Sequence, residues 1–274
     1  MDALTELIGV VGHPVRHSIS PAFWEAALRE AARNAAFLAF EVAPDDFGAF
    51  IEGMRVGGAR GLNVTLPHKG AAFALTDERS ETAESTRAVN VLVFDDQTTR
   101  GYNTDVHGVS AALADLGVEL EGTSALVLGA GGAGRAAVAA LRGGGAKVSV
   151  ANRTADRAAA TGVDVVDWAA VPEVLGDFDV VVHTTSVGLN GTGSVLDRAA
   201  LDAAARGRLR AVLDVVYRPG LTPLVESARA AGLAADDGLR MLVHQAAEAW
   251  RLFFGDDAPV DVMHEAAAAA AGRT

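Results

Sequence analysis

The sequence predicts a protein with two α/β domains, and three observations lead to this fold class. The chain has 274 residues, and at about 150 residues per domain this length favours two domains. Half of the residues (50%) are hydrophobic and 21% are charged, which is typical of a folded globular protein. Short apolar runs alternate with helical patterns of roughly 10 to 15 residues, as they do in parallel α/β architectures.

The first domain is predicted from the alternating pattern that precedes residue 104. Ser20 and Pro21 form a typical helix start, because a hydroxyl that caps the helix is followed by proline at the first helical position. Pro67 is likewise expected to open a short helix. The expected strands are Leu7–Val11, Phe37–Val42, Gly61–Val64 and Val89–Phe94, and the longer helices are Pro21–Arg33 and Asp45–Met54.

The second domain follows a change in the pattern after Asn103. Val106, Val109, Leu113 and Leu116 form one apolar helical stripe, which we interpret as the hinge between the domains. A second alternation of strands and helices then begins. Its expected elements are the strands Ala125–Leu128, Lys147–Ala151, Val163–Val166, Val180–His183 and Ala211–Val216, and the helix Gly134–Leu141.

A glycine-rich turn directly follows the strand Ala125–Leu128 and opens a helix. In this context, the first glycine of Gly-x-Gly-x-x-Gly allows a tight turn, the second lets a pyrophosphate approach the backbone, and the third brings helix and strand together. The anion would lie at the helix N-terminus. The alternative is a turn without a ligand, which the strand-turn-helix context disfavours. The candidate cofactor-binding residues are Gly129, Ala130, Gly131, Gly132, Ala133 and Gly134.

The end of the next strand indicates which dinucleotide is bound. About 20 residues after such glycines, an acidic residue accepts the ribose hydroxyl of NAD, whereas an arginine suits the 2′-phosphate of NADP. Here the strand is followed by Asn152, Arg153 and Thr154, with no acid. We therefore predict NADP as the cofactor. The alternative is that Arg153 is an exposed loop arginine before a helix capped by Thr154.

Two helices end the chain. Leu239–Phe254 and Val260–Ala271 follow the second alternation without another predicted strand, so we expect them to fold back onto the first domain. The predicted domains are 1–103 with 239–274, which would bind substrate and carry out catalysis, and 104–238, which would bind NADP. The fold class is therefore α/β, with an N-terminal α/β substrate domain and a Rossmann-like dinucleotide-binding domain.

Two hydroxyls lie close to the first predicted helix. Ser18 and Ser20 would form a neutral anion site suited to a carboxylate. Helix capping alone explains Ser20, whereas Ser18 has no such structural reason. His13 and His17 do not indicate a metal site, because Pro14 lies between them and no acidic third ligand adjoins, so we expect no metal.

Lys69 and Asp105 are the candidate catalytic residues. A helix that opens at Pro67 puts Lys69 in its first turn, where the macrodipole disfavours a cation. Such a conflict with local stability is typical of a functional site, although a solvated lysine is the common alternative. For Asp105, two interpretations stay open. An acid in the first helical turn is favourable for stability alone, or it pairs with Lys69 and holds or relays its proton.

Eight ordered motifs resemble the shikimate dehydrogenase family, and the resemblance covers essentially the whole chain. They are Ser18-x-Ser20-Pro21, Asn63-Val-Thr65-x-Pro67-x-Lys69, Ala88-Val-Asn90, Asn103-Thr-Asp105-x-x-Gly108, the glycine turn from Gly129 to Gly134, Asn152-Arg153-Thr154, Asp214-Val-Val-Tyr217-x-Pro219-x-x-Thr222-Pro223, and Gly238-x-x-Met241-Leu-x-x-Gln245.

The resemblance implies NADP-dependent, reversible reduction of 3-dehydroshikimate to shikimate, a step in aromatic amino-acid (chorismate) biosynthesis. It implies that Lys69 and Asp105 form the catalytic pair. The substrate would contact Ser18, Ser20, Thr65, Asn90, Asp105, Tyr217 and Gln245. The cofactor would contact the glycine turn, residues Asn152 to Arg157 including Arg157 itself, Gly238, Val215 and Glu81. The chain departs from the family pattern at His183, where asparagine is usual, at Leu189, where methionine is common, and at Arg240, where a small residue is frequent.

Charge and cysteine content exclude several classes of function. Asp and Glu outnumber Lys and Arg by 35 to 23, and a net charge of −12 would repel nucleic acid and anionic membrane surfaces. The chain has no cysteine, which excludes disulfides and thiolate nucleophiles. The acidic first residues and the lack of any apolar run near about 18 residues lead us to expect a cytoplasmic protein without a membrane span.

Three other functions stay open at this stage. A quinate or dual quinate/shikimate dehydrogenase would tolerate an extra ring hydroxyl. Another two-domain NADP enzyme with a lysine, such as a methylenetetrahydrofolate dehydrogenase, is the second. The third is an NADP-binding sensor without turnover, against which the joint presence of Lys69 and Asp105 argues. The expected partner is a small-molecule substrate. No heptad or extended apolar patch is evident, so a monomer and a homodimer are both compatible with the sequence.

Overall fold

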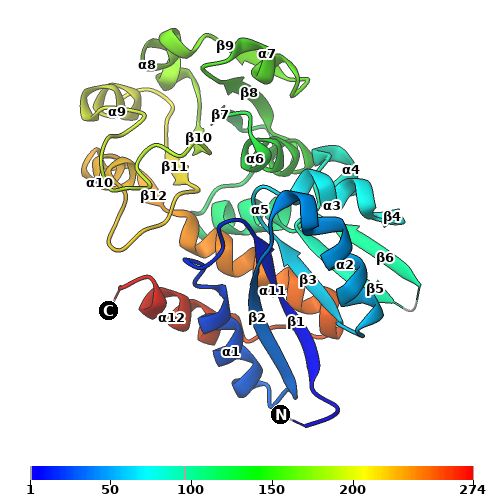
Figure 1. Ribbon diagram of the computed structural model, residues 1–274. Coiled ribbons are helices and arrows are strands. Elements are labelled where there is room, and N and C mark those ends of the chain that lie inside the picture. Colours follow the sequence, from blue (N-terminus) through cyan, green and yellow to red (C-terminus); the bar gives the residue numbers. More distant parts are fainter. Residues whose placement is uncertain (1, 96, 274) are drawn as a thin grey trace. The chain divides into compact units, whose positions relative to one another are not determined.

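Two six-stranded sheets, one in each of two units, organise the chain (Figure 1). The computed structural model describes residues 2–95 and 97–273. The first unit comprises Met1–Thr104 and Val243–Thr274, and the second comprises Asp105–Leu242. Both sheets carry helices and are rich in parallel strands, so the predicted α/β fold class is confirmed.

The first sheet is mixed. Its strand order is β2-β1-β3-β5-β6-β4, and β1 pairs in parallel with both β2 and β3. β5 is antiparallel to β3 and to β6, with which it forms a hairpin absent from the sequence prediction. The strands are β1 (Glu6–Gly12), β2 (Ala35–Glu41), β3 (Gly61–Val64), β4 (Glu78–Arg79), β5 (Val91–Asp95) and β6 (Thr98–Tyr102).

Aromatic side chains connect the N-terminal and C-terminal parts of the first unit. Trp24 on α1 stacks on Phe37 of β2 at 4.8 Å between ring centroids, and on Trp250 of α11 at 5.8 Å. This packing bears out the predicted return of the C-terminal helices. The helices are α1 (Ser20–Glu30), α2 (Phe47–Val56), α3 (Lys69–Leu75), α4 (Glu81–Thr86), α11 (Gly238–Phe254), which begins in the second unit, and α12 (Val260–Ala270).

The second sheet is entirely parallel among the described strands. Its order is β12-β11-β10-β7-β8-β9. The expectation that no strand lies between β11 and the final helices is wrong, because β12 pairs with β11. The strands are β7 (Ser124–Leu128), β8 (Lys147–Ala151), β9 (Asp164–Val166), β10 (Val180–His183), β11 (Ala211–Asp214) and β12 (Ala234–Asp236).

Helices cover both faces of the second sheet. On β7, Val127 belongs to a buried cluster with Leu113 and Leu141, and Leu126 belongs to another with Leu201 and Leu224. Strands buried on both faces read as nearly continuous apolar runs, which is why β7 and β10 could be predicted. The helices are α5 (Asp105–Asp115), α6 (Gly132–Gly143), α7 (Ala155–Ala159), α8 (Val171–Val174), α9 (Arg198–Ala205) and α10 (Pro223–Ala230), and short 3₁₀ turns lie at Pro44–Asp46, Trp168–Ala170 and Leu175–Asp177.

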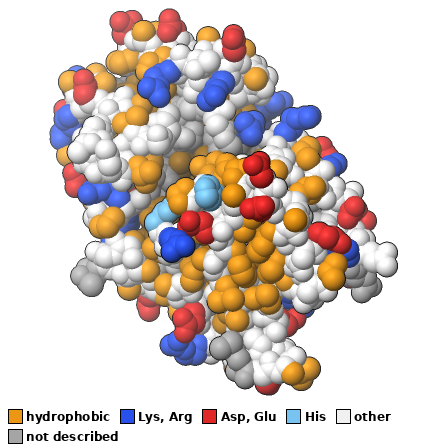
Figure 2. Space-filling model, in the orientation of Figure 1, with side chains coloured by type: hydrophobic (Ala, Val, Ile, Leu, Met, Phe, Trp, Pro, Cys, Tyr) orange, Lys and Arg blue, Asp and Glu red, His pale blue; other side chains and the backbone are white. Residues whose placement is uncertain are grey.

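Part of the first sheet is exposed at its β2 edge. Figure 2 shows hydrophobic side chains gathered over the β1 and β2 edge of this sheet, where Leu38 is 49% exposed. None of the described helices has the length and apolar character that a membrane span requires.

Candidate active site

Polar side chains of the first unit gather where β1 and β3 end. The backbone N–H of His13 donates to the carbonyl of Leu66 at 3.0 Å, which ties the loop after β1 to the loop after β3. A Cβ on Gly12 would lie only 2.5 Å from Cγ2 of Thr65, so glycine allows this close approach. The loop that carries Ser18 therefore lies beside the loop that carries Thr65.

Ser18 rather than Ser20 accepts a backbone hydrogen bond at the start of α1. Ser20 is the first residue of the helix, and its N–H donates to Oγ of Ser18 at 3.2 Å. The prediction that Ser20 caps the helix is wrong, because Ile19 occupies the cap position without a side-chain acceptor. Among the described residues, the Ser20 hydroxyl has no hydrogen-bond partner, so it is available to a ligand.

Lys69 is the first residue of α3. The predicted helix start at Pro67 is two residues early, since the N–H of His68 donates to the carbonyl of Thr65 at 3.0 Å and forms a turn there. Lys69 nevertheless stands in the first helical turn, as expected. Its half-buried side chain lies at the end of the helix where backbone N–H groups are unpaired, an unfavourable place for a cation.

His68 holds the start of α3 in place. Its buried ring stacks on Phe47 of α2 at 4.4 Å, and Nε2 lies 2.8 Å from the carbonyl oxygen of Val42. The carbonyl of Lys69 accepts the N–H of Val89 at 3.0 Å. These contacts fix the backbone of Lys69 next to the segment that carries the candidate substrate ligand Asn90.

Asn90 and Gln245 meet through Thr104, a residue that the sequence analysis did not select. Nδ2 of Asn90 donates to Oγ1 of Thr104 at 3.0 Å and to Oε1 of Gln245 at 3.3 Å, and the N–H of Thr104 donates to Oδ1 of Asn90 at 2.7 Å. All three side chains are buried. The motif Asn103-Thr-Asp105 contained the signal, but a threonine between two polar residues gave no reason to prefer it.

A further polar atom of the first unit was missed. Asn63 on β3 is 7% exposed, and its Oδ1 has no hydrogen-bond partner among the described residues. Burial of an unpaired acceptor costs about 1–3 kcal/mol, so such an atom is expected to meet a ligand donor. Because Asn63 lies two residues before Thr65, this acceptor belongs to the same end of β3.

The glycine turn of the second unit has the three predicted features. Gly129 follows β7 with φ of +114°, a conformation that L side chains rarely adopt. A Cβ on Gly134 would lie 2.3 Å from the Gly129 carbonyl oxygen, so α6 is held directly against the turn. A Cβ on Gly131 or Gly132 would meet nothing within 4 Å. The backbone between the two close contacts is thus open to a ligand at the N-terminus of α6.

Asn152 joins the end of β8 to the glycine turn. Its Oδ1 accepts the N–H of Ala130 at 3.3 Å, and its Nδ2 donates to the carbonyl of Thr154 at 2.9 Å. Thr154 makes no side-chain hydrogen bond at the start of α7. Arg153 and Arg157 are exposed and, within the described part of the chain, their side chains make neither a hydrogen bond nor an ion pair. Two cations are therefore available beside a turn suited to an anion.

Val215 and Gly238 are in contact within the second unit. A Cβ on Gly238 would lie 2.0 Å from the Val215 carbonyl oxygen, so only glycine fits there. Tyr217 follows closely, and burial raises the pKa of its hydroxyl above the ordinary value, so Tyr217 stays a neutral donor at physiological pH.

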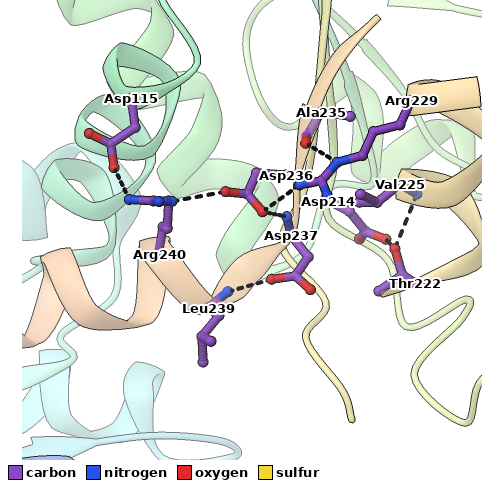
Figure 3. Close-up of polar contacts among 10 residues, drawn as sticks. All are labelled: Asp115, Asp214, Thr222, Val225, Arg229, Ala235, Asp236, Asp237, Leu239 and Arg240. Carbon is purple, nitrogen blue, oxygen red and sulfur yellow. Dashed lines mark hydrogen bonds and ion pairs between the residues drawn. The ribbon is translucent and has the colours of Figure 1, made fainter. Parts of the chain in front are cut away.

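Arg240, two residues after Gly238, forms ion pairs with two carboxylates (Figure 3). Its Nε lies 3.0 Å from Asp236 and its Nη1 lies 3.3 Å from Asp115 on α5. These ion pairs account for a long basic side chain at this position.

The remaining candidates lie at helix starts. Asp105 is the first residue of α5 and is buried, and Glu81 is the first residue of α4 and is exposed. Lys69 and Glu81 belong to the first unit and Asp105 to the second. No group of three or more metal-ligating side chains occurs in the residues the structure describes.

A parallel sheet covered on both faces and followed by a glycine turn, joined to a second α/β unit that carries a lysine and a buried cluster of amide and hydroxyl groups, defines a dinucleotide-binding α/β protein of two units. The chain belongs to the shikimate dehydrogenase family. Residues 10–92 match the shikimate dehydrogenase substrate binding domain, 111–216 match shikimate / quinate 5-dehydrogenase, and 238–268 match the shikimate 5′-dehydrogenase C-terminal domain.

Individual relatives support the same family over nearly the whole chain. A shikimate dehydrogenase (NADP(+)) from Halobacterium salinarum is 44% identical over 265 residues, which are 95% of this chain and 98% of the relative. The crystal structure of shikimate 5-dehydrogenase from Thermus thermophilus in complex with NADP(H) and shikimate is 37% identical with a TM-score of 0.89, and the match covers 97% of this chain and 100% of that one. Quinate dehydrogenase from Corynebacterium glutamicum in complex with NAD is also similar, at 32% identity and a TM-score of 0.86, covering 96% of this chain and 98% of that one.

Proposed function

We propose that this chain is an NADP-dependent shikimate dehydrogenase, which reversibly reduces 3-dehydroshikimate to shikimate in aromatic amino-acid (chorismate) biosynthesis. The observation that carries the proposal is the pairing of two features in one chain. One is Lys69, whose backbone is bonded to the segment that carries the buried amide and hydroxyl cluster of Asn90, and the other is a glycine turn beside a strand end that has arginines and no acid. The names of the relatives over most of the chain agree with this activity.

In this proposal, one domain binds the cofactor and the other binds the substrate. Residues 104–238 bind NADP, and residues 1–103 with 239–274 bind the substrate and carry Lys69. The open backbone at Gly131 and Gly132 fits a pyrophosphate, and the unpaired Arg153 and Arg157 fit the 2′-phosphate. When bound, NADPH supplies the hydride. The residues proposed to bind the cofactor are Gly129, Ala130, Gly131, Gly132, Ala133, Gly134, Asn152, Arg153, Thr154, Arg157, Val215, Gly238 and Glu81.

Neutral hydrogen-bonding groups bind the substrate in this proposal. A ring acid with several hydroxyls needs donors and acceptors rather than a full countercharge, and the buried cluster of Asn90, Thr104 and Gln245 provides both. The unpaired Oδ1 of Asn63 supplies one more acceptor for a hydroxyl. The proposed substrate ligands are Ser18, Ser20, Thr65, Asn90, Asp105, Tyr217 and Gln245.

Lys69 moves the proton in this proposal. Negative charge develops on the carbonyl oxygen of the substrate as the hydride arrives, and the Lys69 ammonium donates its proton there. Asp105 orients Lys69 and accepts a hydrogen bond from it. In the reverse direction, neutral Lys69 would accept the proton of the substrate hydroxyl while the hydride leaves the same carbon for NADP.

The setting of the enzyme is part of the proposal. A charged dinucleotide co-substrate does not cross membranes unaided, which supports a cytoplasmic enzyme. We propose that it works as a monomer or a homodimer, with a small-molecule substrate as its partner.

A steady-state assay tests the proposed function. Purified protein should reduce NADP with shikimate, and the rate should fall strongly when quinate replaces shikimate. The similarity to a quinate dehydrogenase makes quinate the second candidate substrate, and a higher kcat/KM with quinate would favour it. Absence of turnover with both acids would contradict the proposal.

Replacing Ser18 by alanine should raise KM for shikimate about tenfold without changing the affinity for NADP. The reason is that the hydroxyl is assigned to the substrate carboxylate, and one such hydrogen bond to a charged group contributes about 1.5 kcal/mol. Steady-state kinetics and an NADP titration measure the two effects. Ser85→Ala on the exposed side of α4 is the control and should leave both values unchanged. Weaker NADP binding in Ser18→Ala would contradict this placement.

Replacing Asp105 by asparagine should lower kcat about tenfold, because the amide cannot orient the Lys69 ammonium as a carboxylate does. Kinetics with shikimate and thermal unfolding of the same variant measure this. If the melting temperature falls while kcat is retained, Asp105 serves only the stability of α5.

A further inference from the structure

A buried histidine joins the ends of two neighbouring strands in the second unit. His183 is the last residue of β10 and is 1% exposed. Its Nδ1 lies 2.8 Å from Oδ1 of Asp214, the last residue of β11, and its Nε2 lies 2.5 Å from Oγ1 of Thr185. The ring therefore connects β11 with the loop that follows β10.

The surrounding hydrogen bonds determine which ring nitrogen carries the proton. Asp214 is an acceptor on both oxygens, because Oδ1 accepts the N–H of Val216 at 3.1 Å and Oδ2 accepts the hydroxyl of Thr222 at 2.7 Å. Figure 3 shows how Thr222 in turn accepts the N–H of Val225. Because both oxygens of Asp214 already accept, we assign Nδ1 of His183 as the donor to Asp214.

In the tautomer that carries its proton on Nδ1, the other ring nitrogen is an acceptor. Oγ1 of Thr185 lies 2.5 Å from Nε2 of His183 and donates its hydroxyl hydrogen there, while the same oxygen accepts the N–H of Val187 at 3.3 Å. One continuous series of hydrogen bonds thus runs from Val187 through Thr185 and His183 to Asp214. Loss of any member leaves a buried polar group unpaired.

The loop held by this series lies against the glycine turn. The N–H and the hydroxyl of Thr184 both donate to the carbonyl of Leu128, at 2.8 and 2.9 Å, directly before Gly129. A Cβ on Gly129 would lie 2.6 Å from Oγ1 of Thr184 and 3.1 Å from Cγ2 of Thr185. Movement of Thr184 and Thr185 would therefore displace the wall of the turn.

We propose that His183 is a positioning residue for the dinucleotide site, which acts through Thr185 to hold the loop of residues 184–187 against the glycine turn. The inference rests on the proposed function in one respect, that the ligand of the turn is NADP. An asparagine at this position reaches about as far as Nδ1 of an imidazole and not as far as Nε2. The histidine of this chain thus provides a contact to Thr185 that an asparagine cannot make.

Two substitutions remove the same hydrogen bond from opposite ends. His183→Asn keeps a donor for Asp214 and loses the contact with Thr185, and Thr185→Val loses the hydroxyl and keeps the shape of the side chain. Each should raise the Kd for NADP about three- to thirtyfold, measured by calorimetry without substrate. The double variant should bind NADP as weakly as Thr185→Val does and no more weakly, because His183→Asn breaks a contact that Thr185→Val has already removed together with the Val187 hydrogen bond. KM for shikimate should stay close to that of the parent protein.

Thr123→Val is the matched control, since its hydroxyl donates to the Glu119 carbonyl before the opposite end of β7. It should leave the Kd for NADP unchanged, and thermal unfolding should show that all variants are folded. Single variants that bind NADP as the parent does, or effects that add in the double variant, would overturn the inference. A parent protein that binds no NADP would instead overturn the proposed function and the inference with it.

Discussion

Replacing Lys69 by alanine should lower kcat about 10²- to 10⁴-fold, the usual contribution of a positioned general acid. The half-buried side chain begins α3 and is proposed to donate the proton to the substrate oxygen. The fold should persist, because alanine is favourable in a helix and a cation in the first turn is not. NADP affinity should also be unchanged. Single-turnover kinetics and an NADP titration measure these effects.

The chain offers a matched control for this variant. Lys69 and Lys147 are its two lysines, and Lys147 is exposed at the start of β8. Lys147→Ala should retain the activity of the parent protein. With an amine-directed reagent, saturating shikimate should protect Lys69 and not Lys147. Equal kcat in Lys69→Ala and the parent, or equal labelling of Lys69 with and without shikimate, would reject the assignment.

Replacing Arg153 by alanine should remove most of the preference for NADP over NAD. The 2′-phosphate carries roughly −1.5 to −2 charges, and a charge-assisted arginine contact contributes about 1.5–3 kcal/mol, or about 10- to 150-fold in affinity. Arg153 is exposed and, over the described residues, makes no ion pair, so its removal costs the fold little. The loss should appear as weaker NADP binding with NAD nearly unaffected. Values of kcat/KM for both cofactors measure the preference.

Asn152→Asp tests the same loop in the opposite direction. The carboxylate keeps an acceptor for the Ala130 N–H and loses the donor to the Thr154 carbonyl, and its charge would repel the 2′-phosphate. Preference should therefore move toward NAD. Arg206→Ala, which removes an exposed arginine after α9, is the control and should not change it. Two results would show that residues 152–154 do not determine the cofactor preference and only lead into α7. One is a parent enzyme that uses both cofactors equally, and the other is an Arg153→Ala variant that still discriminates between them.

The elements that could be predicted are those buried on both faces or those that have strict backbone requirements. β10 is buried along its whole length and begins with three valines, and β8 carries buried Val148 and Val150, so the bounds predicted for both strands agree with the structure. The glycine turn was predictable because Gly129 and Gly134 satisfy a steric requirement that few residues can meet. β6 was missed because Thr98–Tyr102, with the sequence Thr-Thr-Arg-Gly-Tyr, contains no apolar run. α10 was missed although Thr222 and Pro223 give the same start signal as α1.

The polar contacts of the site were less predictable than its position. The exchange of roles between Ser18 and Ser20 depends on a one-residue shift of the helix start, which is smaller than the precision of sequence patterns. Thr104 contacts a partner 141 residues away, Gln245, so no local pattern contains this contact. Spacing identified which segments carry the site, whereas the pairing of Asn90 with Thr104 required the tertiary structure.

The first unit is discontinuous along the chain, and this affects how a newly made chain can fold. Residues 1–104 are synthesised first, but Trp24 stacks on Trp250, which is made only after the whole of Asp105–Leu242. The second unit is one continuous segment. It can therefore complete its core on the ribosome before the other unit does. Residues 1–104 therefore expose aromatic surface until Trp250 has been synthesised. We expect chaperones to bind mainly at α1 and β2 during synthesis.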